Sequence, residues 1–100
     1  MHTIYIQSHM DITWDPQKAA ENLRSHDVAF ADAATVLDDP CAITIADPEH
    51  DEQRFITLGA DLTGRLLVVV YAYAGAEEIR IISAREASRG ERRRYADEPR

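Results

Sequence analysis

Cysteine and lysine are scarce in this 100-residue sequence, in which Cys41 is the one cysteine and Lys18 the one lysine. A single cysteine excludes disulfide bonds within the chain and is typical of a reducing compartment. No apolar stretch approaches the roughly 20 residues that cross a bilayer as a helix, and the first residues lack the apolar segment of a secretion signal. We therefore expect a single cytoplasmic domain with no membrane partner.

The scarcity of lysine leaves arginine as the basic residue, and its distribution is uneven. The net charge is −7, yet residues 1–61 hold three Lys or Arg against twelve Asp or Glu, and residues 62–100 hold eight Arg against six acidic residues. The overall charge and the lack of a recognisable helix-turn-helix argue against a stand-alone DNA-binding protein. Clustered arginines favour bidentate contacts with carboxylates or phosphates. The alternative is a solvated helix face with ion pairs inside the chain.

The most informative stretch is residues 64–85. Residues 66–73 are apolar at both parities, which predicts a strand covered on both faces near the centre of its sheet. A turn at Gly75 follows, and residues 79–84 form the next strand. Arg80 interrupts that strand and Arg85 ends it. A guanidinium on a mostly buried strand needs an anionic partner, which is either a carboxylate of this chain or a bound anion.

Capping residues and apolar spacing predict three helices. Asp15-Pro16 is typical of a helix start, so residues 16–26 form the first helix. The apolar spacing of residues 31–37 predicts a second, which ends before a proline. Ser88 and Glu91 form a capping box that begins a third helix near the end of the chain.

The remaining strands complete the predicted fold. Residues 11–14 form a short edge strand, and 41–46 and 54–59 form two further strands. The element order predicts an α+β domain, with an antiparallel sheet of four to five strands, two N-terminal helices and one C-terminal helix. We expect one domain over residues 10–96, with residues 1–9 an expression-tag remnant or extension.

Motifs spread over most of the chain resemble one known family. They are Trp14-Asp15-Pro16-x-Lys18-Ala19, Asn22-Leu23-x-x-His26, Phe30-x-x-Ala33, Asp39-Pro40, Asp47-Pro48-x-His50, Glu52-Gln53-Arg54, Gly64-Arg65-Leu66-Leu67-Val68-Val69-Val70, Ile79-Arg80-Ile81-Ile82-Ser83-Ala84-Arg85 and Glu91-Arg92-Arg93-x-Tyr95. The chain thereby resembles BrnT-type toxins. It departs from them at Asp27, where many members have glycine, and at residues 74–76, where many carry a basic residue in the turn.

The resemblance implies a fold, an activity and a partner. It implies a RelE-like fold and an endoribonuclease toxin of a type II toxin–antitoxin system, which cleaves RNA to inhibit translation. The implied partner is a ribbon-helix-helix, BrnA-like antitoxin in a heterotetramer, and the toxin reaches operator DNA only through that antitoxin. One alternative function stays open, a non-catalytic protein-binding module that acts as a co-repressor with its DNA-binding partner.

RNA cleavage without a metal needs a base for the 2′-OH proton, cations for the phosphorane and an acid for the leaving 5′-oxygen. Arg80, Arg85 and Arg54 are the candidate cations, and His26 and His50 the candidate base and acid, because imidazoles titrate near neutral pH. In a straight strand Arg80 and Arg85 would lie on opposite faces, so we expect them to converge only if the chain turns at residues 84–85.

Other side chains are candidates for holding RNA rather than for the chemistry. These are Lys18, Glu52, Arg92, Arg93 and Tyr95, of which Glu52 is also a weaker acid–base candidate. A lone imidazole in the acidic loop 47–52 is a weak metal signal, so we expect no metal or other cofactor. The competing interpretation is structural, because Glu52, Arg54 and Arg80 could form an ion-pair network across neighbouring strands.

Overall fold

The structure, a computed structural model, describes residues 2–6, 10–49 and 53–99. The predicted site residues His50 and Glu52 lie outside the described residues. The elements are β1 (His2–Ile6), β2 (Met10–Trp14), α1 (Pro16–His26), α2 (Phe30–Val36), β3 (Ile43–Asp47), β4 (Arg54–Ala60), β5 (Leu66–Tyr73), β6 (Glu78–Glu86) and α3 (Arg89–Asp97). Within the described ranges, no helix has the length and apolar character needed to span a membrane.

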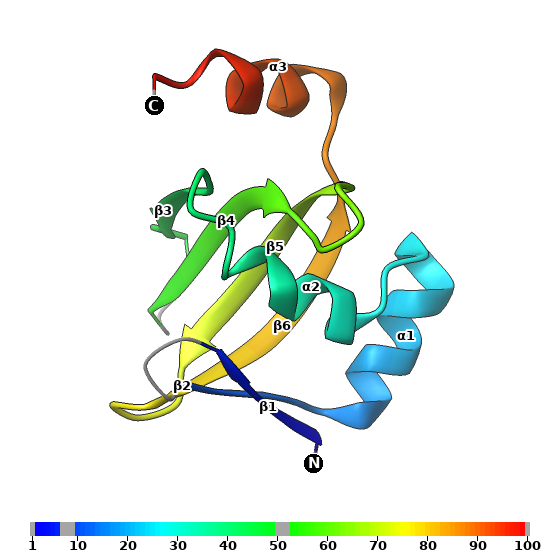
Figure 1. Cartoon of the computed structure of the whole chain (residues 1–100). Helices are drawn as coiled ribbons and strands as arrows, with labels where there is room; N and C mark the ends of the chain where they lie inside the picture. Colours follow the sequence, from blue (N-terminus) through cyan, green and yellow to red (C-terminus); the bar gives the residue numbers. More distant parts are fainter. Residues whose placement is uncertain (1, 7–9, 50–52, 100) are drawn as a thin grey trace.

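All six described strands belong to one sheet, in the order β1-β2-β6-β5-β4-β3 (Figure 1). Strands β3 to β6 form an antiparallel meander, and β5 lies inside it between β4 and β6. The predicted α+β class and the central position of residues 66–73 are confirmed.

The N-terminal strands differ from the prediction in number and in place. The sheet has six strands rather than four to five, and β2 is not an edge strand, because it lies antiparallel to β1 and parallel to β6. The Thr13 hydroxyl donates to Glu78 across the parallel pair at 2.9 Å. The alternation over residues 11–14 predicts a strand, but it does not specify a partner far along the chain. Residues 2–6, expected to be a tag remnant or extension, form β1.

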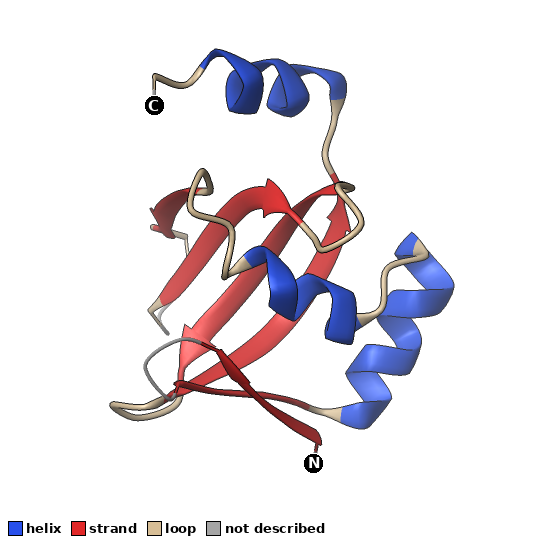
Figure 2. Cartoon of the chain, in the orientation of Figure 1, coloured by secondary structure: helices blue, strands red, loops and turns tan. Residues whose placement is uncertain are grey.

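Helices α1 and α2 cover one face of the sheet, as Figure 2 shows. Between them and the sheet lies the main core, in which Trp14 and Phe30 meet edge to face with ring centroids 6.2 Å apart. The core also contains Ile12, Val28, Val36, Leu67, Val69, Tyr71 and Ile81. The other face, called here the open face, carries α3 near one end only.

Helix α1 has its predicted bounds, Pro16 to His26. The Asp15 carboxylate accepts from the Gln17 amide at 2.8 Å, as expected of an N-cap. The buried Asn22 side chain then ties the helix to β6, because it donates to the Ala84 carbonyl at 2.8 Å and accepts from the Ala84 amide at 3.1 Å. Asn22 thus satisfies backbone groups of β6 beyond its pairing with β2, which ends at Arg80.

Helix α2 and strand β3 begin close to their predicted positions. Helix α2 starts at Phe30, one residue earlier than expected. Strand β3 starts at Ile43, two residues later than expected. Asp39 explains the later start, because its side chain accepts from the Cys41 amide at 2.9 Å and its carbonyl accepts from the Ala42 amide at 3.1 Å. These bonds close a turn before the strand can begin.

Asp27 ends α1 in the left-handed conformation, with a φ of 56°. A glycine there would carry no Cβ strain and would remove a negative charge from the helix C-terminus. We expect Asp27→Gly to stabilise the fold by about 0.5–1 kcal/mol and to raise the melting temperature by a few degrees. Asp27→Ala removes the same charge but keeps a Cβ, so it should not stabilise. A thermal melt in which both variants behave alike would contradict this account.

Candidate functional site

One irregularity in β6 sets the geometry of the open face. Along the pairing of β5 with β6, Tyr71 lies opposite Ile81 and Val70 lies opposite Ser83, so Ile82 is an extra residue in β6. An inserted residue reverses the alternation of side chains beyond it. Arg80 pairs with Ala72 and Arg85 with Val68, which share a parity on β5. The two arginines therefore lie on the same face.

The predicted cause of this convergence was wrong. We expected the chain to turn at residues 84–85, but β6 continues as a strand to Glu86. The bulge at Ile82, rather than a turn, brings Arg80 and Arg85 to the same face of the sheet. The sequence pattern does not predict this bulge, because Ile81 and Ile82 are both typical strand residues.

Arg54 joins the same face through the register of the neighbouring strand. Ala72 of β5 pairs with Arg54 of β4 on one side and with Arg80 of β6 on the other. Side chains of directly opposite residues point to the same side of a sheet. With strands about 4.8 Å apart, the Cα atoms of Arg54 and Arg80 are separated by about 10 Å, and Arg85 lies roughly 13 Å along β6 from Arg80.

A groove of about 450 Å³ lies on the open face and brings four polar side chains together. His26 comes from the end of α1, Ser83 and Arg85 from β6, and Glu91 from α3. We call this the polar groove. Its lining unites a candidate acid–base imidazole, a hydroxyl and a candidate cation with a carboxylate, and these come from three elements that are distant in sequence. Arg54 and Arg80 share its face but do not line it.

Glu91 is the anionic partner of Arg85 within the chain. The two Glu91 carboxylate oxygens accept from the two terminal nitrogens of Arg85 at 2.8 and 2.9 Å. Hydrogen bonds from Arg85, with those from Ser88, lower the pKa of Glu91 from 4.5 to about 2, against the opposing effect of partial burial. The hydrogen bonds to Glu91 raise the pKa of Arg85 above its ordinary value. The pair is therefore charged throughout the physiological range.

The Arg85–Glu91 pair also belongs to the start of α3. The Ser88 hydroxyl accepts from the Glu91 amide at 3.2 Å, and Glu91 accepts from the Ser88 amide at 2.7 Å, which confirms the predicted capping box. One glutamate therefore caps α3 and binds Arg85. The orientation of α3 and that of the guanidinium are coupled through this side chain.

Tyr95 anchors the far end of α3. Its hydroxyl donates to the Asp39 carboxylate at 2.7 Å, and that carboxylate also accepts from the Ala60 amide at 2.9 Å. The Tyr95 ring packs against the small cluster of Leu58, Val68 and Ala87. The structure thus gives Tyr95 a packing role, and its contact with RNA stays a prediction.

The remaining candidates lie around the polar groove rather than in it. Lys18 is exposed on α1 and shares a shallow pocket with His26 and Ile82. Arg92 and Arg93 are exposed on α3, and a nitrogen of Arg92 lies 3.9 Å from Glu86. In the described parts of the chain, no three His, Cys, Asp or Glu side chains gather as a metal site would require.

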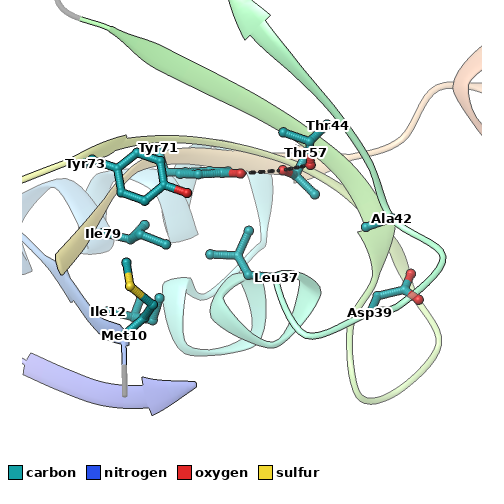
Figure 3. A pocket seen from close by; sticks show the side chains of 10 residues that line it. All are labelled: Met10, Ile12, Leu37, Asp39, Ala42, Thr44, Thr57, Tyr71, Tyr73 and Ile79. Atoms are coloured by element: carbon teal, nitrogen blue, oxygen red, sulfur yellow. Dashed lines mark hydrogen bonds between the residues drawn. The ribbon is translucent and has the colours of Figure 1, made fainter. Parts of the chain in front are cut away.

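The helix-covered side of the sheet has a pocket of its own, drawn in Figure 3. Its volume is about 290 Å³, and its lining includes Tyr71, Thr57 and Thr44, whose hydroxyls form a chain of hydrogen bonds of 2.8 Å each. None of the predicted site residues lines it. Arg54, Arg80 and Arg85 therefore lie apart from this pocket, on the open face.

Sequence reasoning missed two residues of the polar groove, Ser83 and Glu91, as site residues. The capping box did identify Glu91 as a helix cap, but its second function depends on a contact with Arg85 that spacing does not reveal. No local signal marks Ser83, which shares a face with Arg85 in any strand but joins the face of Arg80 only through the bulge.

Comparisons with known proteins give a consistent result. A family model described as ribonuclease toxin, BrnT, of type II toxin-antitoxin system matches residues 14–91. The crystal structure of the Brucella abortus ribonuclease toxin BrnT superposes with a TM-score of 0.60 at 26% identity, covering 78% of this chain and 96% of that one. A search of curated proteins finds no match.

The Arg85–Glu91 pair predicts an acid-sensitive contribution to stability. Because the folded-state pKa of Glu91 is lowered to about 2, its stabilisation is present above pH 4.5 and is lost as the pH falls towards 2. The Arg85 side chain is 47% exposed, so solvent screening limits the effect to about 0.5–1 kcal/mol.

Glu91→Gln should remove this part of the acid sensitivity in urea unfolding at pH 2 to 7. Glu77→Gln, which changes an exposed glutamate in the turn between β5 and β6, is the matched control and should follow the wild type. Equal acid sensitivity in wild type and Glu91→Gln would refute the assignment.

Proposed function

The chain belongs to the BrnT family of ribonuclease toxins of type II toxin–antitoxin systems, and we propose that it is a cytoplasmic endoribonuclease that cleaves RNA and thereby stops translation. The observation that carries the proposal is the gathering of Arg54, Arg80 and Arg85 on one sheet face, with His26 and Ser83 beside Arg85. A folded RNA strand presents phosphates at intervals along its length, and arginines spread over 10–13 Å can contact more than one of them.

The chemistry follows from the groups on the open face. His26 takes the proton of a ribose 2′-OH, whose oxygen attacks the adjacent phosphorus. The bond to the 5′-oxygen breaks as the new bond forms, which leaves a 2′,3′-cyclic phosphate and a 5′-hydroxyl. Arg80 and Arg85 donate to the phosphorane oxygens, where negative charge accumulates. A protonated side chain, for which His50 is the candidate, returns a proton to the leaving oxygen.

This route needs no metal ion, because the nucleophile is a hydroxyl of the substrate rather than a water molecule that must be activated. The arginines supply the charge that a metal would otherwise provide. Ser83, which lies between Arg80 and Arg85 on β6, can donate a further hydrogen bond to a phosphate oxygen from the lining of the polar groove.

The remaining surface residues extend the contact with RNA. Lys18 lies near His26 on α1, and Arg92 and Arg93 project from α3. Cations at these places add attraction to the phosphate backbone without selecting a base sequence. The partner that neutralises the toxin is a ribbon-helix-helix antitoxin of the BrnA type, in a heterotetramer that binds operator DNA through the antitoxin.

One observation favours a second candidate function. Arg85 is already held by a carboxylate of its own chain, as a structural ion pair would be. In this alternative the protein is a non-catalytic module that binds its partner and acts as a co-repressor. It would then form a tight complex with the antitoxin while the purified protein leaves RNA intact.

Substitution of the arginines separates these functions. Expression of the wild-type chain alone in bacteria should arrest growth, and Arg80→Ala or Arg85→Ala should relieve the arrest. In a purified assay each change should lower cleavage by about 100-fold or more, as expected for the loss of one donor to a transition state. Arg24→Ala, which removes an exposed arginine of α1 outside the polar groove, is the control and should remain toxic. Normal growth with well-expressed wild-type protein would exclude a toxin.

The products and the metal requirement test the mechanism itself. Cleavage should continue in excess EDTA and should yield 2′,3′-cyclic phosphate and 5′-hydroxyl ends. A substrate with a single 2′-deoxy sugar at the cleavage position should resist cleavage there, because the nucleophile is missing. Loss of activity in EDTA with recovery on adding Mg²⁺ would contradict the mechanism.

A further inference from the structure

A second groove lies on the open face beneath α3. It has a volume of about 90 Å³, and its lining consists of aliphatic side chains from β3, β4 and β5 together with Glu91 and Arg94 of α3. We call it the apolar groove; its aliphatic residues are Ile43, Ile45, Ile56, Leu58 and Val68. The register pairs Ile45 with Ile56 and Leu58 with both Ile43 and Val68, so these side chains form one continuous strip.

Helix α3 covers this strip only in part. No residue of α3 is buried, and the Ile45 side chain on the outer strand is 49% exposed. Isoleucine is among the residues most often buried in a folded monomer, and exposed apolar surface of this kind marks an interaction site when it is contiguous. Leu58 and Val68 are buried at the inner end of the strip. Ile43 and Ile56 are half-buried and Ile45 is exposed, so the uncovered part lies over β3 and β4.

The charges around the apolar groove indicate the chemistry of the occupant. Arg94 lines it together with Glu91, whose carboxylate is bound by Arg85. Helix α3 carries Arg89, Arg92 and Arg93 as well, in a chain whose net charge is −7. Unlike the polar groove, which holds His26, the apolar groove has an aliphatic floor and no aromatic ring in its lining on which a base of RNA would stack. A protein segment that combines aliphatic side chains with acidic ones fits both the floor and the basic rim.

We infer that the apolar groove is the docking site of the antitoxin, which inserts a segment of aliphatic residues flanked by Asp or Glu. The inference rests on the proposed function, from which the antitoxin as partner follows. The apolar and polar grooves share Ile45, Ile56, Val68 and Glu91 in their linings. A segment seated beneath α3 therefore reaches the groove of His26, Ser83 and Arg85, and neutralisation follows from coverage of that groove.

The test uses isothermal titration calorimetry to measure binding of a purified ribbon-helix-helix antitoxin that relieves the growth arrest when it is expressed together with this chain. Ile45→Glu places a charge in the apolar groove and should weaken binding by at least about tenfold. Leu23→Glu is the matched control, because Leu23 is also 50% exposed but lies on α1 outside both grooves, and it should bind like the wild type. Thermal melts confirm that each variant is folded.

Arg94→Glu provides an independent variant on an exposed helix position, so the test does not depend on the folding of Ile45→Glu. Reversal of this rim charge should weaken binding by about five- to tenfold and reduce its salt dependence. Arg24→Glu, the same change on α1, is its control. Wild-type affinity in both groove variants, or no binding of the antitoxin to the wild type, would overturn the inference.

Two further outcomes would also overturn it. If Ile45→Glu weakens binding of RNA but not of antitoxin, the apolar groove belongs to the RNA site. If the wild type alone is a dimer in gel filtration and Ile45→Glu is a monomer, a second copy of the chain occupies the groove. The experiment distinguishes failure of this inference from failure of the proposed function. If the wild-type protein binds antitoxin but cleaves no RNA, the proposed function fails, yet the affinities of the variants for antitoxin can still be compared.

Discussion

The bulge at Ile82 is the constraint on which the open face depends. Side chains alternate along a strand, so Arg80 and Arg85, five positions apart, would face opposite sides of a regular β6. The extra residue restores a common face, and it also brings Ser83 to that face and turns Ala84 towards the helix-covered core. Asn22 then holds the Ala84 backbone from α1. A shift of one residue thus links the sheet register to the place of α1 and to the arginine cluster.

The physical chemistry of a guanidinium left two partners open for Arg85, a carboxylate or a bound anion. In the folded chain Glu91 takes the carboxylate role with a bidentate contact. This does not exclude a phosphate, because a guanidinium has five N–H donors and Glu91 binds only one edge of it. A carboxylate that fixes one edge limits the orientations of the other. Because Glu91 already orders the Arg85 guanidinium, less conformational entropy is lost when an anion binds. The negative charge of Glu91 also weakens the electrostatic attraction between Arg85 and that anion.

Local signals in the sequence predicted the parts of the fold that local interactions determine. The Asp15 cap, the bounds of α1 and the Ser88–Glu91 capping box depend on neighbouring residues, and all are present. The parallel pairing of β2 with β6 and the bond from Tyr95 to Asp39 join residues far apart in the chain. The bulge is also non-local, because it is a feature of how β6 pairs with β5 and not of the β6 sequence alone. The candidate arginines were therefore identifiable from sequence, but their common face was not.

The open face is divided between two kinds of surface, and α3 lies at their boundary. Both parts include Ile45, Ile56 and Val68. One part adds His26, Ser83 and Arg85, which suit a phosphate, and the other adds Ile43, Leu58 and Arg94. Glu91 lines both parts and caps α3 as well. Helix α3 buries none of its residues, and its contacts with the rest of the fold include those of Glu91 and Tyr95. Any partner that shifts α3 must therefore move Glu91, and with it the guanidinium of Arg85. The position of α3 and the orientation of the Arg85 guanidinium are coupled through one carboxylate.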